Sequence, residues 1–169
     1  MSIFYSRLIA LLLCFSVTIP AHAVTVQSWS GQHSSQPDPA VRVARTDIEW
    51  AAIWTAVGQT PPYPLPAGRM GVAVFLGFRS SGGFSVSVDG FEDRECLRVV
   101  QFTEEQPAPN AIVIKMITFP WTVELLPATT KPTVFETTLS GRNSGPVIPS
   151  SEGMRLAEFG EACVGGTAR

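Results

Sequence analysis

The chain has 169 residues, of which 12 are Lys or Arg and 14 are Asp or Glu, so its formal net charge is −2. This slightly acidic balance argues against a nucleic-acid partner, which would need a basic face. Beyond an N-terminal apolar run, no stretch is long and apolar enough to cross a bilayer, so no membrane span is expected in the mature chain.

Residues 1–23 have the pattern of an export signal. One basic residue, Arg7, precedes an apolar run over residues 8–18, and the small residues Ala21 and Ala23 follow. This order of regions is typical of a signal peptide cleaved after Ala23. The alternative is an uncleaved anchor, but the apolar run is shorter than the roughly 18–20 residues that a span needs. We therefore expect a periplasmic or secreted protein of one domain.

The mature chain begins with short extended segments and then a helix. Apolar and polar residues alternate from Val24 to Trp29, which predicts a strand, and residues 41–43 form a second extended piece. Thr46 and Glu49 have the spacing of a capping box, which predicts a helix start. The apolar residues that follow at helical spacing are Trp50, Ile53, Trp54 and Val57, and Gly58 can end the helix. We expect the tryptophans to pack on a sheet.

From Gly71 onward the pattern changes to strands and turns. The apolar run Val72–Phe78, the glycine-containing turn at residues 79–83 and the alternating residues 84–88 predict a β-hairpin, and Asp89-Gly90 predicts another turn. Further strands are expected at residues 96–102, 112–117, 121–126 and 134–138, whereas residues 140–151, which are rich in Gly, Pro and Ser, are expected to be flexible.

These elements predict a mainly β fold with one helix. We expect an antiparallel β-sandwich or curled sheet, with the helix near the N-terminus packing on it. The expected organisation is a signal peptide at residues 1–23, a β domain at residues 24–130 and a partly flexible C-terminal extension at residues 131–169.

The mature chain retains two cysteines, Cys96 and Cys163. An oxidising compartment favours a disulfide between them, and such a loop would contribute roughly 4 kcal/mol. The alternative is a buried thiol at Cys96 and a loose one at Cys163. Spacing alone leaves both open, because it does not supply the geometry.

Catalytic chemistry has few candidate groups. The mature chain has one histidine, His33, in a polar loop, and with two separated cysteines this makes no metal-ligand set. The acidic residues lie in polar, turn-like surroundings and are expected to be solvated; they are Glu92, Asp93, Glu95, Glu104 and Glu105. We therefore expect a protein that is not an enzyme and that uses no cofactor or metal.

Two loops are the candidate partner-binding surface. The first offers an arginine, hydroxyls and paired glycines, and the second offers two aromatic residues around a proline, which are groups that binding hot spots favour. The candidate residues are Arg79, Ser80, Ser81, Gly82, Gly83, Phe84, Phe119, Pro120 and Trp121. The alternative is that both aromatic residues point inward and that the glycines merely make a hairpin turn.

Three segments occur in the order seen in PrcB-type domains, the C-terminal domains of the protease complex subunit PrcB. They are the helix segment at residues 47–54, the strand–turn–strand at residues 74–86 and Thr118-Phe119-Pro120-Trp121. The chain resembles this family over residues 24–127. The family turn Pro-Thr-Gly-Gly-Tyr stands here as Ser-Ser-Gly-Gly-Phe. The resemblance implies a non-catalytic subunit that associates with another exported protein, a protease being the candidate, and stabilises it.

A second resemblance belongs to another functional class. The turns at Ser80–Phe84 and Thr118–Trp121 are similar to the loop wedge of chagasin-type inhibitors of cysteine peptidases, although Phe119 stands where that family has an arginine. This resemblance implies peptidase inhibition by an immunoglobulin-like sandwich. A third possibility is an enzyme that uses a pair of carboxylates, such as Glu92 or Glu104 with a neighbour.

Overall fold

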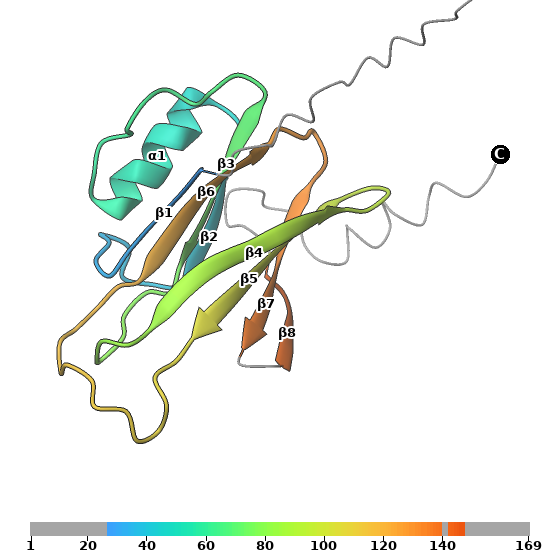
Figure 1. Cartoon of the computed structure of the whole chain (residues 1–169). Helices are drawn as coiled ribbons and strands as arrows, with labels where there is room; N and C mark the ends of the chain where they lie inside the picture. The colour runs from blue at the N-terminus through green and yellow to red at the C-terminus, as the bar shows by residue number, and fades with distance from the viewer. Residues whose placement is uncertain (1–26, 140–141, 148–169) are drawn as a thin grey trace, which may run out of the picture.

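The computed structural model describes residues 27–139 and 142–147, which form two sheets packed face to face and one helix (Figure 1). One sheet has the strand order β1-β6-β3-β2 and the other has the order β4-β5-β7-β8. The elements are β1 Gln27–Gly31, β2 Ala40–Ala44, α1 Asp47–Val57, β3 Arg69–Phe75, β4 Ser85–Asp93, β5 Arg98–Glu105, β6 Trp121–Pro127, β7 Thr133–Leu139 and β8 Arg142–Val147. The prediction of a mainly β fold with one helix on a sheet is confirmed.

Strand direction departs from the prediction at one place. All paired strands of the described residues are antiparallel except β5 and β7, which run parallel. The chain leaves β5, crosses to the first sheet to form β6, and returns to the end of the second sheet where β5 began. A parallel pair needs such a crossover. Because β7 and β8 complete the second sheet, the sheet continues past residue 130, where we expected the β domain to end.

The predicted hairpin over Val72–Phe78 and residues 84–88 is wrong. Strand β3 lies between β2 and β6, so neither of its edges is left to pair with β4. After β3 the chain turns away: Gly77 has φ +71°, and the Phe78 N–H donates to the Pro37 carbonyl at 2.9 Å. The next strand, β4, therefore lies in the opposite sheet.

Three further local predictions need correction. Asp89-Gly90 does not turn the chain; it lies inside β4 at a β-bulge, and the reversal comes at residues 94–97. Residues 112–117 do not form a strand, because they are irregular and most of their large side chains are exposed, with no sheet face to cover. The segment at residues 140–151, expected to be flexible, contains β8; its other residues lie outside the described part of the chain.

Helix α1 forms as its sequence predicts. The Glu49 N–H donates to the Thr46 hydroxyl at 3.3 Å and the Thr46 N–H donates to the Glu49 carboxylate at 3.0 Å, which completes the capping box. Gly58 ends the helix with φ +86°. The helix buries Trp50, Ile53, Trp54, Ala56 and Val57 against the outer face of the first sheet.

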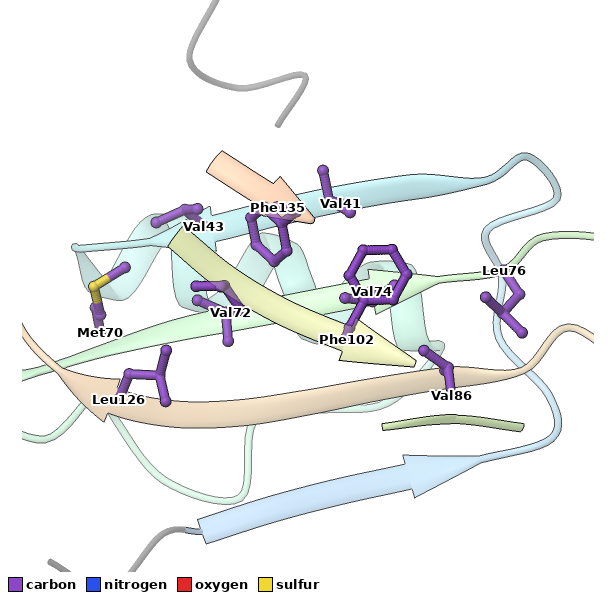
Figure 2. Close-up of a cluster of buried hydrophobic side chains, with 11 residues drawn as sticks. Val41, Val43, Met70, Val72, Val74, Leu76, Val86, Phe102, Leu126 and Phe135 are labelled. Carbon is purple, nitrogen blue, oxygen red and sulfur yellow. The ribbon is translucent and has the colours of Figure 1, made fainter. Parts of the chain in front are cut away.

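The main core lies between the two sheets (Figure 2). Its side chains come from β2, the β3 segment and β6 on one side and from β4, β5 and β7 on the other; they are Val41, Val43, Met70, Val72, Val74, Leu76, Val86, Val100, Phe102, Leu126 and Phe135. A charged residue joins the end of this core. The Arg98 side chain is buried and donates to both oxygens of Asp93, at 2.8 and 2.7 Å, and to the Pro127 carbonyl.

Candidate functional site

The two predicted loops lie side by side at one end of the molecule. Arg79 and Thr118 exchange backbone hydrogen bonds of 2.9 and 3.0 Å, and the Gly82 N–H donates to the Ile114 carbonyl at 2.9 Å. The Thr118 hydroxyl also donates to the Ser81 carbonyl at 3.0 Å. These bonds join the β3–β4 connection to the β5–β6 connection, which projects from the end of the sheets (Figure 1).

Two of the predicted partner-binding residues are not accessible. Trp121 is 4% exposed; its indole N–H donates to the His33 carbonyl at 2.9 Å, and its ring packs edge-on against Trp54. Pro120 is buried as well. The side chains of Pro120 and Trp121 therefore belong to the interior. Phe119 is half-buried, with its ring 6.2 Å from the ring of the exposed Phe78.

Arg79 holds the first loop in place. Its guanidinium pairs with Glu104 at 2.9 Å, donates to the Leu76 carbonyl at 2.7 Å and lies 5.5 Å from the centre of the Phe84 ring. Gly83 has φ +87°, a conformation that glycine adopts without strain. Because of its contacts with Glu104 and Leu76, Arg79 anchors the loop against β5, and its guanidinium is already occupied within the molecule.

Sequence reasoning missed the main exposed apolar surface. Its five large side chains, here called the apolar end patch, are Phe78, Ile112, Ile114, Met116 and Ile117. Ile112 is fully exposed and Ile114 is 73% exposed. Taking about 200 Å² for a whole large residue, main-chain atoms included, the five residues together expose about 660 Å². The sequence contains a signal for this loop: Pro107 and Pro109 precede the apolar run, and Pro120 ends it.

The acidic side chains considered for catalysis mostly serve as partners in ion pairs. Glu92 pairs with Arg94 at 3.1 Å, Asp93 with Arg98 at 2.7 Å, and Glu104 with Arg79. Within residues 27–139 and 142–147, no three His, Cys, Asp or Glu side chains are grouped as metal ligands, and no helix there is long and apolar enough to cross a membrane.

The carboxyl group of Glu124 differs from the acidic groups described above because it is buried. Glu124 lies on β6, opposite Ser28 and Val72, on the same face as the core residue Leu126, and it is buried. Desolvation, with a smaller contribution from the negative charge of Asp89, raises the pKa of Glu124 to about 7. The neutral form of this carboxyl group is therefore favoured in the folded state.

Replacing Glu124 with glutamine is expected to remove a pH dependence of stability. Since its folded pKa lies above the ordinary 4.5, the contribution of Glu124 to the free energy of unfolding is highest below about pH 4.5, falls as the pH rises towards 7 and is level above it. Thermal unfolding at about pH 5 and about pH 8 measures this. Glu124→Gln should have a higher unfolding temperature than wild type only at about pH 8. Glu95→Gln, an exposed control, should show no such increase. An equal change at both pH values would contradict the raised pKa of Glu124.

Cys96, between β4 and β5, is disulfide-bonded. Its partner lies outside the described residues, so the pairing with Cys163 stays a prediction. The topology is compatible with it, because β8 runs antiparallel to β7 and so heads back towards the end of the sheet that carries Cys96.

Comparison with known proteins gives one match. Residues 70–124 match the family model described as PrcB C-terminal. This span begins in β3 and ends in β6, so it includes both loops and the apolar end patch, but not the helix that was part of the resemblance. No curated protein and no solved structure matches the chain. Over residues 70–124 this chain is therefore similar to the PrcB C-terminal family, which supports the resemblance drawn from its sequence.

Proposed function

We propose that this protein is an exported, non-catalytic subunit that binds and stabilises another exported protein, a protease, through the apolar end patch. A protease is proposed as the partner because of the similarity to the PrcB family. The residues that match the family model, 70–124, contain the whole patch. The N-terminal signal pattern and the disulfide at Cys96 both support an oxidising compartment outside the cytoplasm.

The observation that carries this proposal is the size and fixation of the apolar end patch. Its five residues together expose about 660 Å², main-chain atoms included, which is comparable with the roughly 300–600 Å² of the largest apolar patch on a typical monomer. This area approaches the roughly 800 Å² that one partner contributes to a standard interface. The hydrogen bonds between Arg79 and Thr118, and between Gly82 and Ile114, hold the two segments together before a partner arrives, so binding would lose less conformational entropy.

The end patch can be tested by a matched pair of substitutions. Ile114→Asp places a charge on a 73% exposed residue of the patch and is expected to reduce capture of the partner about tenfold or more. Ile48→Asp is the control, because Ile48 is 84% exposed but lies on α1, away from the patch. Affinity capture with a crosslinker from the exported fraction, followed by identification of the captured peptidase, provides the measurement.

Both variants should keep the thermal stability of the wild type, since neither side chain is buried. Recovery of the same peptidase with Ile114→Asp and with wild type would show that the end patch is not the interface. Capture that contains no peptidase at all would argue against the protease partner itself.

The inhibitor alternative has one observation in its favour and one against it. The two loops adjoin, as the edge of an inhibitory wedge requires. However, Trp121, the aromatic residue that this wedge would present, is buried beneath the surface. Dose-dependent loss of papain activity with the purified protein would restore the inhibitor, and protection of a protease from autolysis would favour the subunit.

A further inference from the structure

Strand β2 is an edge with a hollow on each of its two faces. Among the strands that the structure describes, β2 is hydrogen-bonded to β3 alone, so its other edge has no neighbouring strand there. Side chains alternate along it: Val41 and Val43 enter the core between the sheets, while Ala40, Arg42 and Ala44 lie on the side of helix α1.

The hollow on the helix side contains a guanidinium, that of Arg42, with no counter-ion among the described residues. The groove runs between β2 and α1 and is lined by Ser35, Gln36, Arg42, Ala52, Thr55 and Ala56. One terminal N–H of Arg42 donates to the Gln36 side-chain oxygen at 2.9 Å, and the group lies 5.9 Å from the Phe75 ring centre. No described carboxylate forms an ion pair with Arg42, and its Nε is buried with no hydrogen-bond partner.

An unpaired, half-buried guanidinium is costly, because its donors lose water without gaining acceptors. A carboxylate matches the planar guanidinium in shape and would neutralise its charge. The helix side of β2 therefore has the chemistry of a carboxylate site.

The hollow on the other side is apolar. It has a volume of about 190 Å³ and lies at the end of the space between the sheets, with the Arg79–Glu104 ion pair on its wall. Its apolar lining includes four side chains of the core between the sheets, Val41, Val74, Leu76 and Phe102. A cavity of about 150 Å³ holds a benzene-sized group, so this one has room for a large aliphatic side chain.

We propose that the edge of β2 binds an extended segment of another protein in which an acidic residue is flanked by aliphatic residues. A strand added to β2 would form backbone hydrogen bonds and would send successive side chains to opposite faces. The acidic side chain then reaches Arg42 in the helix-side groove, and a flanking aliphatic side chain enters the cavity between the sheets. This site is on a different element from the apolar end patch and does not depend on the proposed protease partner.

The probe for this site is the peptide acetyl-Ser-Leu-Glu-Leu-Ser-amide, titrated into the full mature chain labelled with ¹⁵N. We expect saturable shifts of the Arg42 Nε–Hε signal and of the β2 backbone amides. The peptide with Gln in place of Glu should bind about tenfold more weakly, because it lacks the charge. The peptide with Ala in place of both Leu residues should also bind more weakly, because it leaves the cavity empty.

Substitutions and a small anion separate this site from its alternatives. Arg42→Lys keeps the positive charge but lacks the planar guanidinium, so it should weaken binding of the Glu peptide about tenfold. Arg94→Lys, an exposed control, should not weaken it. Ile114→Asp should leave peptide binding unchanged, which distinguishes this site from the end patch. Acetate at equal concentration should not reproduce the β2 shifts. Equal binding of the Glu and Gln peptides, shifts confined to residues outside β2, or no saturable shift would each overturn the proposal.

Discussion

Replacing Arg98 with alanine is expected to lower the free energy of unfolding by about 3–5 kcal/mol. The Arg98 side chain is 3% exposed, and its guanidinium lies 4.2 Å from the Phe91 ring centre. It binds Asp93 on the β4 side of the fold and the Pro127 carbonyl at the end of β6, so one side chain ties the two sheets together. Alanine would leave a cavity and a carbonyl without its donor.

Denaturant unfolding of wild type and variant measures this loss. Arg94→Ala is the matched control, because Arg94 has a similar pair with Glu92 but is half exposed, and it should cost less than about 1 kcal/mol. The hydrogen bond from Arg98 holds the pKa of Asp93 below its ordinary 3.8. The stability from this pair is therefore present above about pH 3.8 and is lost as the pH falls through the lowered pKa. Equal losses for both arginines would show that the burial of Arg98 contributes nothing.

Trp50→Ala as a separate variant is also expected to lower the free energy of unfolding by about 3–5 kcal/mol, measured by denaturant unfolding. The Trp50 ring lies against the backbone of Gly71, where a Cβ atom would come within 2.5 Å of it, and it packs edge-on against Trp54 at 5.5 Å. Its indole N–H donates to the Tyr63 carbonyl at 2.9 Å, which fixes the proline-rich connection over the helix. Alanine would remove the contact between the Trp50 ring and Gly71 of β3.

Trp50→Phe separates the packing from the hydrogen bond. Phenylalanine keeps most of the ring contact with Gly71 but loses the bond to Tyr63, so it should cost clearly less than alanine. Near-ultraviolet circular dichroism should show that the other three tryptophans keep their environment in the phenylalanine variant. A loss as large as that of alanine would mean that the bond to the Tyr63 carbonyl, and not the packing, holds the helix on the sheet.

Sequence reasoning succeeded where neighbouring residues decide the structure. The capping box at Thr46 and the left-handed conformation at Gly58 each depend on a few adjacent residues, and α1 was predicted within a residue at either end. Strand β6 likewise follows from its apolar run. Pairing between distant segments was not predictable in this way: the glycines near residue 82 fit a hairpin turn, yet both edges of β3 are occupied by strands that lie far from it in sequence.

The candidate site was predicted in part for the same reason. The two loops were identified from their residue types, but their contact through Arg79 and Thr118 depends on the crossing of the chain between sheets. Ile112 and Ile114 fit a buried strand by composition and are exposed because no sheet face lies over them. Trp121 fits a binding hot spot by type but points into the core, because the direction of a side chain follows from strand register.

The interleaving of the two sheets has a consequence for how the molecule assembles. Strand β6 lies between β1 and β3, yet it is synthesised after β4 and β5, which belong to the other sheet. Neither layer can therefore be completed until β6 and β8 have been made. Pairings over such long sequence separations are reached slowly, and unpaired strand edges stay open in the meantime. The newly made chain should depend on chaperones until these strands arrive.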